Sequence, residues 1–555
     1  MKKNYFLPLL FTLFTPALIN AQSGPGGIGN SSTMEVWLDA SQLNLNNNDP
    51  VSSFTDFSGN NNHAEQASST FRPLYKTNQI NGRPAIEFDG SNDRMDFLSN
   101  ISNQESTTFI VFNSSKFGYQ TLLTTKNYLL ATQSGKSIMW FNNFNQKIQN
   151  SFSNSTNSFM WYTSAAGTTN IPVRLASKVQ ETTFNRLTSL NRSTSTLGAY
   201  FTNDNTHMHF YYGQIAEVII FKQENNFVQQ RIVRAYLSAK YDLNQLPNLY
   251  HFASTHPNEV FGIGQESSGG NYTAKGSGIV EISNASSLDN GDYLLIGHDG
   301  GSLSTTTSVG SAYASNRYNR IWRASLTNAP GTIDIKIDLT GNNFAANPAT
   351  DYRLLVDNLT GTFSNLGIKS SITGTYNAID ETITFTGVSL DEGDFFTLAD
   401  RPNEITAVSD GDWDSPGTWD CSCVPTYSDN ALIPSPITVD IDGASAYIEG
   451  LTIDAGATLN FASNDSLLLK GDLLQNGTIN GSTGLIGFNG TSAQEAWNNS
   501  GSPVTLFNIF ANNVNNFSFR SGEWNITNFI KVEVGQMIND GATVTFVSDD
   551  FPAFN

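Results

Sequence analysis

The sequence predicts an all-β, multidomain chain that contains one long helix. Over most of its length, short apolar runs alternate with turn-forming clusters such as residues 46–50 and 89–93, a rhythm typical of antiparallel sandwiches. Residues 226–241 are the one convincing stretch with apolar residues at helical spacing over several turns. From Tyr447 onward, short strands with Gly or Asn corners follow closely, which favours a stacked repeat. We therefore expect two β-sandwiches followed by a β-helix or solenoid.

Length and composition narrow the class of protein. A chain of 555 residues predicts about three or four domains. The formal net charge of −20 and the pI of about 4.6 disfavour nucleic acid and anionic membranes as partners, because both are polyanions. Two cysteines cannot supply a disulfide framework, so the domains must be held by apolar cores.

The N-terminal segment, residues 1–21, reads as a secretory signal. Two lysines precede an apolar stretch at 6–18, and a plausible cleavage site lies before Gln22. The alternative, a membrane anchor, is disfavoured because the run is short and contains Pro8 and Pro16. No later run is long and apolar enough to span a bilayer. We expect a protein that is secreted or at the surface of a Gram-negative bacterium.

The first predicted domain, residues 22–243, ends in a strand at 214–221 and the helix at 226–241. Asn226 is placed to cap the helix, with Gln229 as the partner in a capping box. Four apolar residues share one helical face, and three basic residues lie off it: Val228, Ile232, Ala235 and Ala239, against Arg231, Arg234 and Lys240.

Large apolar residues on the predicted strands supply the expected core of this domain. They are Phe88, Phe109, Val111, Trp140, Phe159, Trp161 and Phe210. Trp140 and Trp161 have an alternative role as sugar-stacking platforms, although an aromatic residue in a sandwich is more often part of the core.

Four stretches carry a family resemblance. Residues 213–221 with the helix, together with 37–41, 56–62 and 81–90, resemble in their order the concanavalin A-like, laminin-G-like jelly rolls of large secreted bacterial proteins. The resemblance covers roughly residues 30–243 and implies a jelly-roll sandwich with the helix at its C-terminus. None of the four motifs is specific for a ligand.

The loop at 56–62 is the most prominent polar cluster of the first domain. Oxygen-bearing side chains alternate at Asp56, Ser58, Asn60 and Asn62, and Ca²⁺ prefers several hard oxygen ligands from a flexible loop. The family resemblance also allows a calcium site. The same residues form ordinary Asx turns, however, and no glutamate lies nearby to complete a dedicated calcium loop. Both interpretations stay open.

Catalytic motifs are weak. Glycoside hydrolases of the resembled fold typically carry a Glu-x-Asp-x-x-Glu cluster, because they need two carboxylates beside the scissile bond. Here Glu217 stands alone on its strand, and Glu87 and Asp89 adjoin turn residues. His207 and His209 share one strand face but have no evident third metal ligand. A Gly-x-Ser-x-Gly nucleophile elbow is also missing.

A linker at 244–258 precedes a second β module at 259–402. Eight strands are expected there: 260–264, 278–282, 293–296, 319–325, 332–339, 352–356, 382–385 and 395–398. Residues 292–301 and 319–323 resemble an uncharacterised module that follows such jelly rolls, which implies no activity. His298, Asp299, Arg320 and Arg323 could form a catalytic group, but a turn and a strand with basic flanks explain them better.

Residues 403–446 form a predicted connector. The stretch 410–419 resembles a sialidase Asp-box, but its glycine falls one place late, so we expect a turn with packed tryptophans. Cys421 and Cys423 are too close for an easy disulfide and too few for a metal site. A local bridge and an intermolecular bond both remain possible.

The last segment, 447–555, is expected to be a parallel β-helix-like repeat. Strands are predicted at 448–453, 456–461, 466–473, 477–479 and 541–546. Gly-Ala-Thr-Leu at 456–459 recurs as Gly-Ala-Thr-Val at 541–544, which favours a solenoid over a third sandwich. The segment resembles the β-helical stalks of bacterial surface adhesins. Such proteins often carry a further sorting or anchoring domain, so the chain is expected to be either a fragment or retained by another mechanism.

Two functional hypotheses follow. The first is a non-catalytic secreted or cell-surface protein, carbohydrate-binding or adhesive through the jelly roll, whose partner is an extracellular glycan or another surface ligand. The second is a secreted polysaccharide-degrading enzyme, either a glycoside hydrolase or a lyase. The missing carboxylate cluster favours the first hypothesis. No cofactor is expected apart from calcium, and calcium only if the 56–62 loop binds it.

Overall fold

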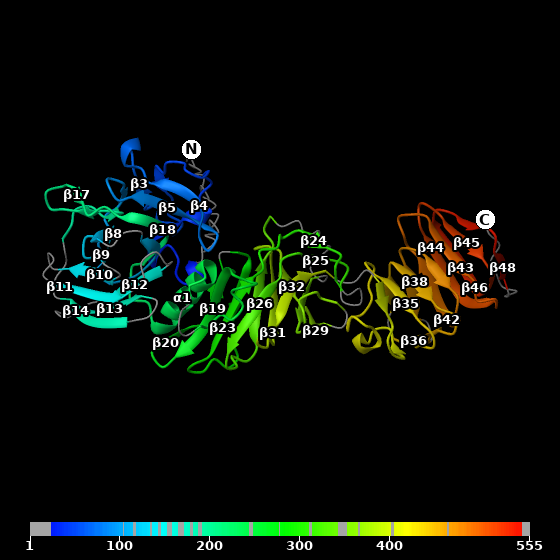
Figure 1. Ribbon diagram of the computed structural model, residues 1–555. Coiled ribbons are helices and arrows are strands. Elements are labelled where there is room, and N and C mark those ends of the chain that lie inside the picture. The colour runs from blue at the N-terminus through cyan, green and yellow to red at the C-terminus, as the bar shows by residue number, and fades with distance from the viewer. Residues whose placement is uncertain are drawn as a thin grey trace, which may run out of the picture. The chain divides into compact units, whose positions relative to one another are not determined.

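A computed structural model describes residues 24–546 apart from short gaps. The gaps are 104, 115–117, 134–135, 142–145, 152–157, 165–170, 178–180, 187–190, 244–247, 277, 310–313, 342–351, 365–366, 401–403, 444 and 463–464, and side chains are not described at 134–190 and 482–483. The predicted secretory signal therefore lies outside the described residues. The chain divides into two compact units, one running to Gly297 with Leu326–Gly331 and one made of His298–Ser325 and Thr332–Asn555. Figure 1 shows strands throughout the described chain and one α-helix, α1.

The first domain contains two antiparallel sheets, as the jelly-roll prediction requires (Figure 1). The first sheet has the order β14-β13-β12-β7-β18-β5-β4, with β1 also paired to β18; the second has the order β11-β10-β9-β8-β15-β6-β3-β2. The strands of the first sheet are β1 (Met34–Asp39), β4 (Leu74–Ile80), β5 (Arg83–Asp89), β7 (Ser106–Ser114), β12 (Ser158–Ser164), β13 (Ile171–Ser177), β14 (Glu181–Arg186) and β18 (Tyr212–Phe221). Those of the second are β2 (Ser53–Phe54), β3 (Ala64–Glu65), β6 (Met95–Phe97), β8 (Gln120–Thr124), β9 (Leu129–Gln133), β10 (Lys136–Phe141), β11 (Gln146–Ser151) and β15 (Thr196–Leu197). Two short strands, β16 (Tyr200–Phe201) and β17 (His207–Met208), form a hairpin.

The central strand β18 is buried on both faces. Val218 and Ile220 belong to one hydrophobic core, whereas Ile219 and Phe221 belong to a second core that includes the helix. Successive side chains of a strand point to opposite faces, so the continuous apolar run of this strand matches a sheet that is covered on both sides. The predicted strand at 214–221 is confirmed within β18.

The predicted core residues differ in outcome. Phe88, Phe109 and Val111 are buried as expected, with the last two on the face that the helix covers. Phe210 is partly buried. The side chains of Trp140, Phe159 and Trp161 lie outside the described residues, so the choice between core and sugar platform stays a prediction.

Helix α1 (Phe227–Tyr241) begins as predicted. The Asn226 side chain accepts a hydrogen bond from the Gln229 backbone N–H, and the Gln229 side chain accepts one from the Asn226 backbone N–H, which completes the capping box. The four predicted apolar residues are buried. Lys240, which the spacing places off the apolar face, is nevertheless buried, with 7% of the residue exposed. The helix packs against both the jelly roll and β19 (Asn258–Glu266), so little of its circumference faces water.

All eight strands predicted for the second β module are present, with boundaries shifted by a few residues. They are β19, β22 (Val280–Ser283), β23 (Tyr293–His298), β26 (Trp322–Thr327), β27 (Ile333–Asp338), β28 (Arg353–Asp357), β31 (Thr382–Val388) and β32 (Phe395–Ala399). Six further strands were not predicted: β20 (Gly269–Asn271), β21 (Ala274–Lys275), β24 (Thr305–Thr306), β25 (Arg317–Tyr318), β29 (Ile368–Thr373) and β30 (Thr375–Asn377). The described pairings are antiparallel, for example β28 with β29 and β32.

The C-terminal segment is a parallel β-solenoid of about five turns (Figure 1). One sheet contains β33 (Glu404–Thr406), β35 (Asn430–Ile433), β38 (Gly450–Ile453), β41 (Leu473–Gln475), β43 (Gln494–Asn498), β45 (Phe517–Ser521) and β47 (Met537–Asn539). The other contains β34 (Gly411–Asp412), β36 (Thr438–Ile441), β37 (Ala446–Ile448), β39 (Thr458–Phe461), β40 (Ser466–Leu469), β42 (Thr478–Phe488), β44 (Val504–Asn512), β46 (Glu523–Val534) and β48 (Thr543–Phe546). The parallel ladder starts at Glu404, so the solenoid includes the segment described above as a connector.

Two predicted strands of the solenoid are each two strands with a corner between them. The run 448–453 turns at Glu449, and the run 466–473 turns after Leu469, so each contributes to both sheets. An apolar run alone does not reveal a corner, because every buried side chain of a coil points inward. The repeated Gly-Ala-Thr phrase occupies equivalent corners, with Gly456 and Gly541 both at positive φ, 92° and 97°.

Candidate functional site

The predicted calcium loop is a hydrogen-bonded turn that fastens β1. Both oxygens of the Asp56 carboxylate accept hydrogen bonds, Oδ1 from the backbone N–H groups of Trp37 and Ser58, and Oδ2 from the Ser58 hydroxyl and the Asn62 N–H. Asn62 Oδ1 accepts from the Ser99 N–H at 2.7 Å. Asn60 donates to the Met34 carbonyl.

These contacts do not fit a calcium ion as arranged. A cation needs lone pairs that converge on one point, and the side-chain oxygens of Asp56, Ser58 and Asn62 are directed at protein donors instead. Within the described part of the chain, no cluster of three or more acidic, histidine or cysteine side chains is placed to hold a metal. Calcium at this loop stays a prediction that needs a direct test.

The two histidines do not share a site. His207 Nε2 lies 3.3 Å from Asp96 Oδ1, and its ring packs on Phe201. The His209 ring packs edge-on against Tyr119, with 4.7 Å between centroids, and burial lowers the pKa of His209. The two imidazoles therefore have separate partners.

In the second module, side chains between residues 298 and 323 form hydrogen bonds to the backbone of a turn. His298 Nδ1 accepts from the Gly300 N–H, and Asp299 Oδ1 accepts from the Gly301 N–H. Arg320 Nε donates to the Gly301 carbonyl. The prediction of a turn rather than a catalytic group agrees with these contacts.

Glu217, the isolated acidic residue of β18, lies in a buried ion cluster. Lys240 Nζ donates to Glu217 Oε2 at 2.8 Å and to Asp39 Oδ2 at 2.5 Å. Trp37 Nε1, Tyr236 OH and Tyr241 OH also donate to the Glu217 carboxylate. Every oxygen of this carboxylate is engaged, so Glu217 joins helix to sheet and is not available to a ligand.

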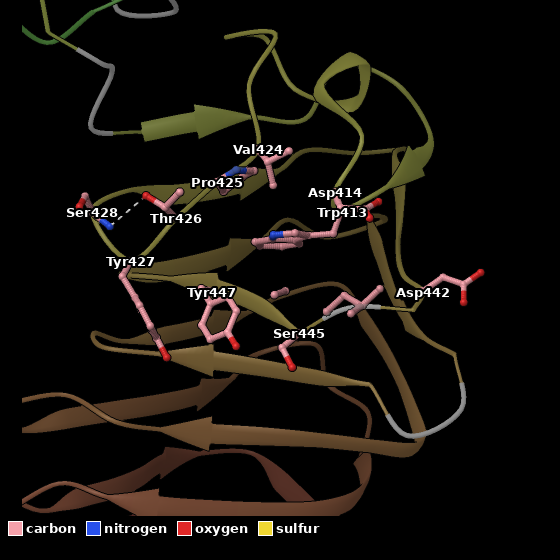
Figure 2. A pocket seen from close by; sticks show the side chains of 12 residues that line it. Trp413, Asp414, Val424, Pro425, Thr426, Tyr427, Ser428, Asp442, Ser445 and Tyr447 are labelled. Carbon is pink, nitrogen blue, oxygen red and sulfur yellow. Dashed lines mark hydrogen bonds between the residues drawn. The ribbon is translucent and has the colours of Figure 1, made fainter. Parts of the chain in front are cut away.

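A hollow of about 450 Å³ lies on the first coils of the solenoid, and we call it the aromatic cleft (Figure 2). Its floor is buried and largely apolar, with Trp413 after β34, Pro425 in the loop before β35, Ile441 at the end of β36, and Ala446 in β37. Figure 2 shows the Trp413 indole extending into the space between Pro425 and Tyr447. This volume lies within the range of roughly 300–1,000 Å³ typical of small-molecule sites.

The rim of the cleft is polar and exposed. It carries the side chains of Asp414, Thr426, Ser428, Asp442, Ser445 and Tyr447. Thr426 is held in the loop by the buried Asp429 carboxylate, to which its N–H and hydroxyl both donate. No described residue donates a hydrogen bond to the carboxylates of Asp414 or Asp442, which face solvent. The rim therefore offers free acceptors around an apolar floor.

Two pairs of packed rings fix the shape of the cleft. Trp413 packs edge-on against Trp419 at 4.9 Å between centroids, and Trp419 Nε1 donates to the Trp413 carbonyl. Tyr427 packs edge-on against Tyr447 at 4.9 Å, with the Lys470 ammonium 4.7 Å from the Tyr427 centroid. The expected pair of packed tryptophans at 410–419 is thus confirmed.

A local disulfide borders the same loop. Cys421 and Cys423 are bonded, with 5.1 Å between their Cα atoms, so the local bridge forms even though the spacing looked unfavourable. The turn at Ser422, whose φ is +49°, brings the two thiols together. Sequence reasoning missed the cleft because its residues come from four segments between 413 and 447, and the available signal was the density of Trp and Tyr there.

Comparisons with known proteins give one family match. Residues 229–394 match a family described as a domain of unknown function (DUF8202). A search of the curated proteins finds no match to this chain.

Solved structures that resemble parts of the chain have low identity. They include a heptameric SAP-like pentraxin from Limulus polyphemus, at 7% identity, covering 27% of this chain and 79% of the pentraxin, TM-score 0.22. The CBM40 of a Ruminococcus gnavus IT-sialidase, bound to alpha2,6 sialyllactose, is 12% identical over 24% of this chain and 83% of its own, TM-score 0.20. An endo-1,3-beta-glucanase from Streptomyces sioyaensis is 11% identical over 36% of this chain and 94% of its own, with a TM-score of 0.19.

Proposed function

We propose that this chain is a secreted or cell-surface protein that binds carbohydrate without cleaving it. The observation that carries the proposal is the aromatic cleft. Carbohydrates present apolar C–H faces and many hydroxyls, and they suit sites in which aromatic rings lie beside unpaired polar groups. Tyr447, Trp413 and the free rim carboxylates supply both features. The jelly roll, where the sequence places glycan binding, is a second binding domain under this proposal.

The acidic residues of the jelly roll support binding over cleavage. A glycosidase needs two carboxyl groups flanking one bond, roughly 5–10 Å apart. The Glu217 carboxylate is fully engaged, Glu87 pairs with Lys76, and Asp89 Oδ1 accepts three backbone N–H groups of its own turn. The described hydrogen bonds thus give these carboxylates structural partners.

The alternative is a polysaccharide-degrading enzyme, for which Asp93 is the candidate proton donor in the jelly roll. Burial, and to a lesser degree the nearby Asp89 and Glu87, raise the pKa of Asp93 to about 6, as a general acid requires. Its Oδ2 accepts the Asp89 N–H at 2.9 Å, however, which also explains its burial as part of the turn.

The whole chain incubated with a broad polysaccharide panel separates the two functions. We expect retention on one or more immobilised glycans, with modest affinity per site that rises when many copies are displayed, and no release of reducing ends or unsaturated products. Product formation that is lost in Asp93→Asn would establish the enzyme instead. A chain that is retained on no glycan and releases no product would refute both.

A further inference from the structure

We infer that the aromatic cleft of the solenoid is a site for neutral glycans and rejects acidic ones. The inference rests on the proposed carbohydrate function and adds the ligand class of this cleft. The amino-acid sequence by itself predicts only a turn with packed tryptophans at 410–419.

The charges of the cleft decide the ligand class. Among its lining residues are two carboxylates, Asp414 and Asp442, and no Lys, Arg or His. Both carboxylates are exposed, and the chain as a whole carries a net charge of −20. A uronic acid, sialic acid or sulfated sugar would bring a like charge beside them, which disfavours binding. Neutral sugar hydroxyls donate hydrogen bonds to carboxylates without this cost.

The rings of Tyr447 and Tyr427 provide a surface on which a sugar ring can pack. Tyr447 is 42% exposed, although it belongs to a strand whose neighbours, Ala446 and Ile448, are buried. Tyr427 packs edge-on against Tyr447 and lies near the Lys470 ammonium, so the two tyrosines are held in a defined arrangement. A rigid aromatic surface loses little entropy when a sugar ring packs on it.

The floor adds a third aromatic ring. Trp413 is 4% exposed, and its indole Nε1 is covered, with no acceptor among the described residues. The indole extends into the cleft (Figure 2), so a sugar in the cleft would meet the ring and not the N–H.

Titration calorimetry on the whole chain tests the assignment. The probes are neutral oligomers of glucose, xylose and N-acetylglucosamine, acidic oligomers of galacturonate and alginate, and cationic chitosan oligomers. At least one neutral oligomer should bind at least tenfold more tightly than any acidic oligomer, with little dependence on salt. Tyr447→Ala should weaken this binding at least tenfold, and Tyr447→Phe should retain it.

Tyr272→Ala is the matched control, because Tyr272 is 57% exposed and lies in the other unit; it should bind as the parent does. The double variant Asp414→Asn and Asp442→Asn should reduce the difference in affinity between neutral and acidic oligomers. This variant still tests the inference if Tyr447→Ala does not fold. Equal binding of acidic oligomers by the parent would overturn the inference, as would chitosan binding that exceeds neutral binding and is lost in salt. If glycan binding survives Tyr447→Ala, the cleft assignment fails while the proposed function stands. If no glycan binds, both fail.

Discussion

Lys240 shows how strongly one buried charge shapes this protein. Its ammonium lies between two carboxylates that are each 1% exposed, those of Asp39 and Glu217. Burial by itself lowers the pKa of Lys240, but the two carboxylates more than offset this and raise it above its ordinary value. Burial raises the pKa of Glu217, which the Lys240 ammonium only partly counteracts. The cluster is stable because its charges and hydrogen bonds are mutually satisfied.

Lys240→Met should therefore destabilise the first unit, by about 3–5 kcal/mol at pH 7, since it leaves two carboxylates buried without a cation. Burial raises the pKa of the Glu217 carboxyl, so its protonation relieves part of the loss. The deficit should be greatest at neutral pH and shrink as the pH falls towards about 4. Chemical unfolding at several pH values measures this.

Lys222→Met is the control, because Lys222 Nζ donates only to Ser31 O and Asn60 Oδ1 in the described structure, at the exposed surface. It should change the free energy of unfolding by less than about 0.5 kcal/mol. A Lys240→Met variant as stable as the parent at pH 7 would show that the cluster is not buried in solution. In the parent, Lys240 contributes fully to the free energy of unfolding at pH values below the pKa of this lysine in the unfolded chain. This contribution should be lost as the pH rises above the raised pKa of Lys240 in the folded protein.

The Asp56 loop makes a second prediction at this scale. The Asp56 carboxylate accepts four hydrogen bonds, one from Trp37 of β1 and three from within the loop, so Asp56→Ala should lower the melting temperature with or without calcium. If an ion binds, calcium should raise the melting temperature of the parent by mass action and EDTA should reverse the rise. A parent melt that does not respond to EDTA would leave the loop as a turn.

At the scale of elements, helix α1 acts as a packing layer. Ile232 is fully buried in the core that joins the helix to β18 and β19. Ile232→Asp should lower the free energy of unfolding by more than about 4 kcal/mol, because it buries a charge without a partner. Thermal unfolding followed by circular dichroism checks this, and a melt equal to the parent's would disprove the packing. Asn226→Ala, which removes the cap, should cost only about 1 kcal/mol, and Asn226→Asp should restore most of it.

The solenoid is held by repetition along its axis. Asn460 Nδ2 donates to Asp440 Oδ1, and Asn480 Nδ2 donates to Asn460 Oδ1, each pair 20 residues apart in sequence. Asn528 and Asn508 repeat the contact farther along. These coils therefore contact one another through side-chain hydrogen bonds as well as through the parallel strands, as stacked repeats require.

At the scale of the whole molecule, the jelly roll with its helix and the solenoid have separate cores. The jelly roll and helix form two of them, and the solenoid forms another that runs from Ile405 to Ile530. In the described part of the chain, none of the helices has the length and apolarity needed to span a bilayer.

Separate cores predict separable unfolding. Leu459 is fully buried in the solenoid core. Leu459→Ala should therefore destabilise the second unit by about 2–5 kcal/mol. In calorimetry, Leu459→Ala and Lys240→Met should each lower a different transition, and the double variant should show the sum of both effects. One transition that both substitutions shift would indicate that the units unfold together.

The sequence by itself determined the strand rhythm, the capped helix and the stacked repeat. These features depend on local signals: turn residues, the Asn226 and Gln229 pair, and Gly-Ala-Thr corners at matching positions. Backbone preferences and side-chain periods act over a few residues, so they can be read from a single chain.

Tertiary structure alone decided two features, the buried ion cluster of Lys240 and the aromatic cleft. In the sequence, Lys240 resembles a surface residue. In the structure, it is buried against Asp39, which lies 201 positions away in the chain. The aromatic cleft exists only because the coils stack, which places Tyr447 beside Trp413 and Tyr427. Burial and long-range charge pairing depend on contacts between distant segments. Burial and long-range charge pairing therefore cannot be predicted from a short stretch of sequence.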